Sequence, residues 1–149
     1  MPNKNTQKQE SRAGQPLVAV VDDDASFSRS LGRLLRSVGY TVNTFNSGHE
    51  FLDSLLDSQP ACLVADMHMP AMSGLELAQR LRAQRRSVPV IFITAFDTPQ
   101  TREQARRAGC FGFLLKPFDN DELLSAIRTA TGTEIKAPGT GKRGEKCCH

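Results

Sequence analysis

The sequence has no tryptophan, a single tyrosine and no long hydrophobic run. Because a membrane-spanning helix needs about 18 or more consecutive apolar residues, no membrane span is expected. Residues 1–16 are polar throughout and lack the apolar core of a signal peptide, so the cytoplasm is the expected compartment. The scarcity of large aromatic rings also argues against a flavin site, where such rings sandwich the cofactor.

The sequence has a formal net charge of +3, but the segment expected to fold carries no excess of positive charge. Residues 1–16 carry three basic and one acidic side chain, and residues 131–149 carry four and two, so each end contributes +2. Residues 17–130 carry twelve basic and thirteen acidic side chains, which gives −1. Because the excess lies at the two ends, no nucleic-acid-binding face is expected on the body.

Cysteine is scarce too, and its four positions match no recognised zinc spacing. Cys62 and Cys110 stand in apolar, strand-like segments, where cysteine usually behaves as a small buried hydrophobe. Cys147 and Cys148, beside His149, could bind a metal ion or form a disulfide, but a flexible tail is the better interpretation.

From Leu17 onward, short apolar runs alternate with amphipathic segments, which is typical of a parallel sheet covered by helices. The expected strands are 17–21, 40–45, 61–66, 88–94 and 110–115. The expected helices lie within 22–39 and over 47–58, 73–86, 101–109 and 121–130. Five such repeats suit a doubly wound sheet, because a barrel needs about eight. We expect one domain over 17–130, a disordered tail over 1–16, and a flexible tail or broken-off linker over 131–149.

Polar side chains collect where these strands end. They are Asp22, Asp23 and Asp24 at the end of the first strand, Asp66 at the end of the third, Thr94 at the end of the fourth and Lys116 just after the fifth. Doubly wound sheets bind ligands at this edge. Carboxylates this close repel one another unless a cation intervenes, and a hard ion such as Mg²⁺ takes oxygen ligands. With no serine or cysteine paired with a base, the set favours phosphoryl transfer, with Asp66 as the nucleophile.

These residues also allow other interpretations. An aspartate at a strand end is usually a turn former or a cap, and Asp24 could be the N-cap of the first helix. An aspartyl phosphatase would use Asp22 and Asp24 as a D-x-D pair, which leaves Asp66 unexplained. His68 and the methionines of the segment VADMHMPAMSG (64–74) could indicate a soft-metal site. The hard ligands on neighbouring strands favour Mg²⁺ instead, so the methionines are expected to pack in the loop and core.

Four segments, VVDDD, VADMHMPAMSGLEL, VIFITA and FGFLLKPF, together resemble the receiver domain of two-component response regulators. The resemblance covers residues 17–130 and is closest to regulators of the FixJ/NarL type. It implies a flavodoxin-like (βα)5 fold, with a doubly wound parallel five-stranded sheet in the order 2-1-3-4-5. It also implies a signalling protein rather than an enzyme, with a sensor histidine kinase and an output domain or protein target as partners. Dimerisation on phosphorylation is possible, without direct nucleic-acid or membrane binding.

The resemblance further implies a role for each site residue. Asp66 is expected to accept the phosphoryl group, Lys116 to bind a phosphoryl oxygen, and Thr94 to turn its hydroxyl toward the phosphate. The expected Mg²⁺ ligands are Asp22, Asp23, Asp66 and the main-chain carbonyl of His68. The side chain of His68 is expected to tune the lifetime of the phosphate.

The resemblance also implies a switch that carries the signal outward. When Thr94 moves inward, the aromatic ring of Phe113 is expected to follow and to reshape the surface of the fourth helix, fifth strand and fifth helix. Ala95 is expected to be small so that its loop can close, and the bond before Pro117 is expected to be cis. A plain core role for Phe113, where many members have tyrosine, is an alternative.

Two questions about the whole protein follow from the resemblance. A receiver fold that is never phosphorylated is one alternative, but such proteins usually lack one of the acids or the lysine. The residues after Ala130 are too few for a helix-turn-helix domain. The chain is therefore either a stand-alone receiver or one excised from a longer regulator, and a stand-alone receiver is the expectation.

Overall fold

In the computed structural model, which describes residues 15–132, five parallel strands form one sheet in the order β2-β1-β3-β4-β5. The strands are β1 (Leu17–Val21), β2 (Thr41–Phe45), β3 (Cys62–Asp66), β4 (Val90–Thr94) and β5 (Gly112–Leu115). The helices are α1 (Ala25–Ser37), α2 (Gly48–Ser54), α3 (Gly74–Ala83), α4 (Pro99–Arg107) and α5 (Asn120–Thr131). The doubly wound fold and the expected strand order are confirmed.

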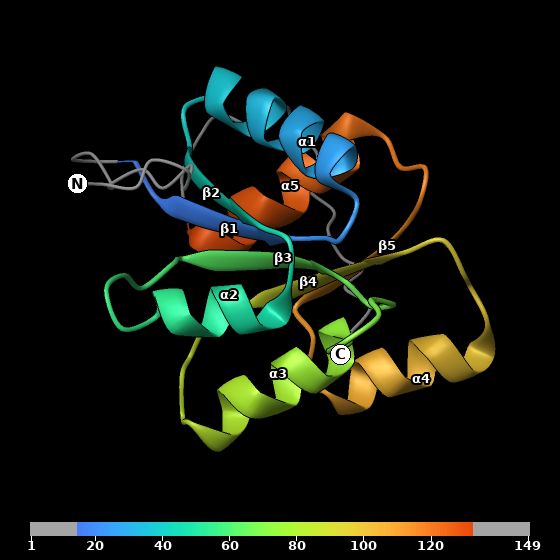
Figure 1. Cartoon of the computed structure of the whole chain (residues 1–149). Coiled ribbons are helices and arrows are strands. Elements are labelled where there is room, and N and C mark those ends of the chain that lie inside the picture. Colours follow the sequence, from blue (N-terminus) through green and yellow to red (C-terminus); the bar gives the residue numbers. More distant parts are fainter. Residues whose placement is uncertain (1–14, 133–149) are drawn as a thin grey trace.

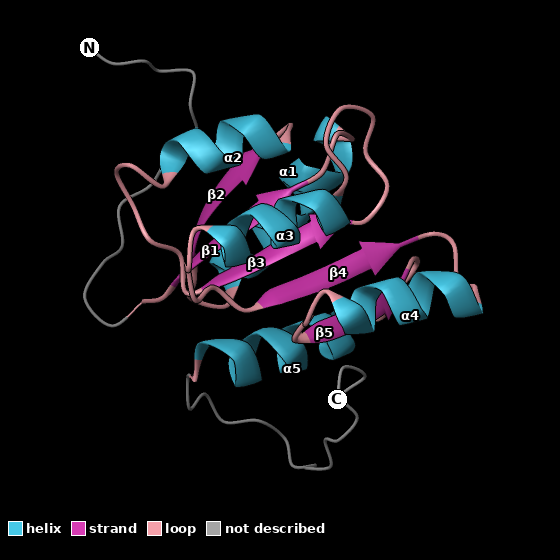
Figure 2. Ribbon diagram, turned by 90° about the horizontal axis from the view of Figure 1, so that it is seen from below, coloured by secondary structure: helices cyan, strands magenta, loops and turns pink. Residues whose placement is uncertain are grey.

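Helices cover both faces of the sheet, with α1 and α5 on one face and α2, α3 and α4 on the other (Figure 1). Figure 2 views the sheet from the side of α2, α3 and α4. Alternate residues of each central strand enter different core clusters: Val18 and Val20 pack with α1 and α5, while Ala19 and Val21 pack with α2 and α3. A strand buried on both faces has no polar side to show, which explains the continuous apolar runs in the sequence.

Most element boundaries shift by one to four residues from the sequence-based expectation, and two of these shifts have a clear local cause. Helix α4 begins at Pro99 rather than 101, because the Thr98 side chain caps it and proline suits the first turn, where its missing N–H needs no partner. Strand β5 begins at Gly112 rather than 110, because Gly109, with φ 77°, turns the chain after α4. The expected N-cap role of Asp24 is confirmed, since its carboxylate accepts a hydrogen bond from the Phe27 N–H at 3.1 Å.

The start of α3 lies directly against the end of β3. The N–H of Gly74 donates to the carbonyl of Met67 at 3.2 Å, and a Cβ at Gly74 would collide with the carbonyl oxygen of Asp66. Only glycine permits this close approach of the two backbones. The conformation of the chain at Asp66 is therefore fixed by main-chain packing.

Other expectations concern the cysteines, the tails and the membrane. Cys62 and Cys110 are both buried, and burial raises the pKa of the Cys62 thiol to about 12. The tails expected over 1–16 and 131–149, with Cys147, Cys148 and His149, lie outside the described residues except for 15, 16, 131 and 132. Within the described part of the chain, no helix is long and apolar enough to cross a membrane.

Candidate functional site

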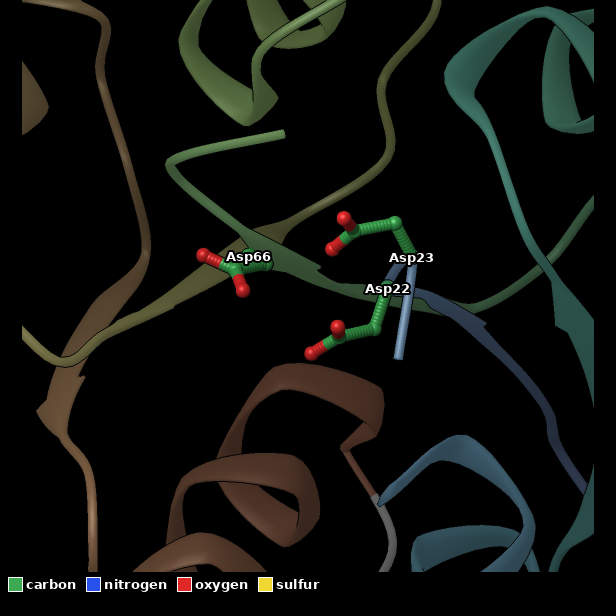
Figure 3. Close-up of side chains that lie close together, drawn as sticks. All are labelled: Asp22, Asp23 and Asp66. Atoms are coloured by element: carbon green, nitrogen blue, oxygen red, sulfur yellow. The ribbon is translucent and has the colours of Figure 1, made fainter. Parts of the chain in front are cut away.

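Three carboxylates gather at the carboxyl edge of the sheet. Asp22 and Asp23 follow β1 and Asp66 ends β3, and one ligand oxygen from each lies within 4.8 Å of the others (Figure 3). Asp22 is fully buried and Asp66 is 9% exposed, whereas Asp23 is exposed to solvent. The parallel register accounts for this meeting, since Val21 pairs with Ala65 and the next residue of each strand is an aspartate.

Main-chain hydrogen bonds hold the two buried carboxylates in the same way. Asp22 Oδ1 accepts from the N–H of Asp24 at 2.9 Å, and Asp66 Oδ1 accepts from the N–H of His68 at 2.9 Å. An aspartate that bonds to the backbone two residues ahead forms an Asx turn, which fixes its side chain. In both residues, Oδ2 is left to face the centre of the site.

Lys116 joins these two carboxylates. Its Nζ lies 3.1 Å from Asp22 Oδ2 and 3.2 Å from Asp66 Oδ2. It also lies 4.3 Å from the centroid of the Phe27 ring, which covers it from the side of α1. The Lys116–Pro117 peptide bond is cis, as the resemblance implied.

Burial and charge act against each other on the ionisable groups of the site. Burial lowers the pKa of Lys116, but the charges of Asp22 and Asp66 outweigh it, so the pKa is raised and the ammonium stays charged at neutral pH. Burial raises the pKa of Asp22, although the Asp24 N–H and Lys116 oppose the change. An ionised Asp22 therefore costs folding free energy, which a further cation beside it would offset.

Thr94, at the end of β4, is buried with its hydroxyl already engaged. Its Oγ1 lies 3.1 Å from Nδ1 of His68 and accepts a hydrogen bond from the N–H of Phe96 at 3.0 Å. The His68 and Phe96 rings meet edge to face, with centroids 5.2 Å apart. The sequence did not indicate these contacts of Phe96 with Thr94 and His68, because Phe96 is 59% exposed and lies in a loop without periodicity.

The remaining expected residues flank this centre. Ala95, Lys116 and Pro117 line one pocket together with Phe27 and Phe118. Phe113 lies on β5, partly buried against the core, where the guanidinium of Arg102 covers its ring. The structure thus brings Asp22, Asp23, Asp66 and Lys116 into one cluster, with Thr94 linked through His68 and Phe113 in the adjoining strand.

The donor set fits a hard divalent cation. Three carboxylates supply oxygen ligands within reach of a single ion, as Mg²⁺ requires. Met67, Met69 and Met72 are buried in the core cluster under α2 and α3. The soft-metal alternative is therefore disfavoured, because the thioethers serve packing.

Comparison with known proteins agrees with this geometry. The family model of the response regulator receiver domain matches residues 18–128. The chain is 42% identical over 132 residues to the transcriptional regulatory protein TdiR of Thauera aromatica, covering 89% of this chain and 57% of that protein. It is 36% identical over 113 residues to the transcriptional regulatory protein FixJ of Bradyrhizobium diazoefficiens, covering 76% and 55%. The chain thus spans about half the length of these curated relatives.

Solved structures show the same fold. The crystal structure of a response regulator receiver protein from Burkholderia phymatum is 44% identical, with a TM-score of 0.73, and the match covers 83% of this chain and 99% of that one. The crystal structure of FixJ-N is 31% identical, with a TM-score of 0.74, covering 83% and 98%.

Proposed function

The chain belongs to the family of response regulator receiver domains, and on this premise we propose that Asp66 accepts a phosphoryl group in a two-component phosphorelay. The observation that carries the proposal is the convergence of three carboxylates and one lysine at the ends of β1, β3 and β5. Such a set offers a nucleophile, a place for a cation and a fixed positive charge, which are the parts that phosphoryl transfer needs.

In the proposed reaction, a carboxylate oxygen of Asp66 bonds to phosphorus as the phosphorus–nitrogen bond of a kinase phosphohistidine breaks. The released imidazole takes up a proton, and Asp66 becomes an acyl phosphate. Lys116, already 3.2 Å from Asp66 Oδ2, pairs with a phosphoryl oxygen. The Thr94 hydroxyl exchanges its present contacts with His68 and Phe96 for the phosphoryl group.

We propose Mg²⁺ as the metal cofactor, held by Asp22, Asp23, Asp66 and the main-chain carbonyl of His68. When bound, Mg²⁺ supplies positive charge that neutralises the carboxylates and the phosphoryl oxygens. Support comes from the three-carboxylate cluster, in which Asp22 is fully buried.

The proposed setting is that of a cytoplasmic signalling domain that is not itself an enzyme. A sensor histidine kinase supplies the phosphoryl group, and the surface of α4, β5 and α5 signals to an output domain or protein target, with dimerisation on phosphorylation possible. The proposal includes no direct binding of nucleic acid or membrane by this domain. The transcriptional regulators that it resembles continue well beyond the part that this chain matches, which supports an output domain.

Incubation with acetyl phosphate and Mg²⁺ tests the proposal. We expect the intact mass of the wild-type chain to rise by one phosphoryl group, and we expect no such rise in Asp66→Ala. Asp53→Ala, which removes an exposed carboxylate on α2, is the matched control and should label like the wild type. Equal labelling of Asp66→Ala would contradict the assignment, and continuous release of phosphate from small esters would favour a phosphatase.

The side chain of His68 is proposed to lengthen the lifetime of the acyl phosphate. Its imidazole lies over Thr94 and against Phe96, at the solvent side of the site. Removing it in His68→Ala should admit water and speed the loss of phosphate severalfold, measured as decay of the labelled mass after acetyl phosphate is removed. His49→Ala, at an exposed position on α2, should decay like the wild type. Equal decay of His68→Ala and the wild type would remove this role.

A further inference from the structure

A guanidinium covers the ring of Phe113. Arg102 stands in the first turns of α4, and its Cζ lies 5.0 Å from the centroid of the Phe113 ring on β5. Phe113 also packs against the core cluster and pairs in register with Phe92 of β4. A cation over an aromatic face attracts the ring electrostatically, so this contact favours the ring position seen here.

The same guanidinium also forms an ion pair with Asp97. Arg102 Nε lies 2.6 Å from Asp97 Oδ1, and Nη2 lies 3.1 Å from Oδ2, which makes the pair bidentate. The hydrogen bonds from Arg102 lower the pKa of Asp97, so the carboxylate is ionised at neutral pH. Arg102 therefore connects the β4–α4 loop to the ring on β5.

That loop leads back to the phosphorylation site. Asp97 is three residues after Thr94, and the intervening Phe96 donates its N–H to the Thr94 hydroxyl at 3.0 Å. The hydroxyl also contacts His68, whose N–H bonds to Asp66 Oδ1. If the hydroxyl turns toward a phosphoryl group on Asp66, the Phe96 contact must change and the loop that carries Asp97 must shift with it.

We propose that the Asp97–Arg102 pair is a restraint on the resting state, which keeps the loop after Thr94 and the Phe113 ring in place until Asp66 is phosphorylated. This inference rests on the proposed function and adds to it the residues that set the threshold of the switch. A contact made in one state only stabilises that state, so removing it favours the other. By linkage, the site then binds a phosphoryl mimic more tightly.

The Glu103 pairs on the same helix provide a contrast. Glu103 bonds to Arg106 and Arg107, and all three residues belong to α4, so these contacts move with the helix as one body. Asp97, by comparison, lies in the loop before α4, whereas its partner Arg102 belongs to the helix. Among the ion pairs of α4 that lie in the described residues, the Asp97–Arg102 pair is the one that joins the helix to the loop after Thr94.

The test is a titration of the full chain with beryllofluoride in Mg²⁺, a mimic of the phosphoryl group, followed by NMR of the Phe113 ring. Asp97→Asn, which breaks the ion pair, should bind beryllofluoride about threefold more tightly than the wild type, and Arg102→Met, which also removes the cation–π contact, should bind it at least as tightly as Asp97→Asn. Before any beryllofluoride is added, the NMR signals of the Phe113 ring in both variants should already lie nearer to their positions in the beryllofluoride-bound state. The double variant should bind no more tightly than Arg102→Met alone, because Arg102→Met already removes both contacts. Glu103→Gln should match the wild type.

The titration distinguishes failure of the proposed restraint from failure of the proposed phosphorylation of Asp66. If the wild type binds beryllofluoride but Asp97→Asn and Arg102→Met show wild-type affinity and ring signals, the restraint is overturned while the proposed function stands. If the wild type itself does not bind, the proposed function is contradicted, and the restraint with it. Asp97→Asn is nearly isosteric at an exposed position, so it decides the question even if Arg102→Met does not fold.

Discussion

Lys116→Met is expected to phosphorylate from acetyl phosphate about 100-fold more slowly than the wild type, the effect of losing one preorganised positive group aimed at developing charge. Methionine keeps an apolar chain against the Phe27 ring, so the change removes chiefly the ammonium. That ammonium is the bonded partner of both Asp22 Oδ2 and Asp66 Oδ2. Its loss leaves the nucleophile and the incoming phosphoryl group without a cation fixed by the protein.

The measurement is the initial rate of mass labelling at saturating Mg²⁺. An Mg²⁺ titration of the same variant separates a catalytic effect from unfolding. Mg²⁺ should still bind, because Asp22, Asp23 and Asp66 are intact and Asp22 and Asp66 are released from their ion pairs with Lys116. A labelling rate within about threefold of the wild type would show that Lys116 only balances charge in the resting site.

Asp23→Asn is expected to weaken Mg²⁺ binding by roughly tenfold to a hundredfold, since affinity for a hard cation follows the number of charged ligands. Asp23 is the exposed member of the cluster, so replacing it removes a ligand without opening the core. The rate of labelling by acetyl phosphate should fall as Mg²⁺ binding weakens, and it should recover partly at high Mg²⁺ concentration. Omitting Mg²⁺ should suppress labelling of the wild type in the same way.

Asp24→Asn provides the matched control, one residue away and with the same change of charge. The Asp24 carboxylate caps α1 by accepting from the Phe27 N–H, and an asparagine oxygen can accept the same bond. Its Mg²⁺ affinity, followed by NMR titration, should stay near that of the wild type. Equal weakening in both variants would mean that net charge, and not ligation by Asp23, governs binding.

Much of the site was predictable because parallel strands align their ends. The apolar runs located β1 and β3 closely, and the registration of Val21 with Ala65 places the following aspartates together. The strand order was not deducible from periodicity alone, since it depends on which strand pairs with which. It was expected through the resemblance and is confirmed.

The contacts around Thr94 and Phe113 were beyond sequence reasoning. Phe96 and Asp97 lie in a loop whose path depends on the Thr98 cap of α4, and the expected start of that helix was two residues too late. In the sequence, Arg102 is only a charged residue within a predicted helix, and such residues usually point into solvent. Its link to Phe113 depends on how α4 lies over β5, which no local pattern encodes.

The central claim is that Asp66, among the carboxylates gathered here, carries the phosphoryl group. Borohydride reduces an aspartyl phosphate to homoserine, so reduction after labelling with acetyl phosphate and Mg²⁺, followed by peptide mass mapping, identifies the residue directly. We predict homoserine at position 66 and unmodified aspartate at positions 22 and 23. Homoserine at position 22 or 23, or labelled protein with an unmodified Asp66, would contradict the account.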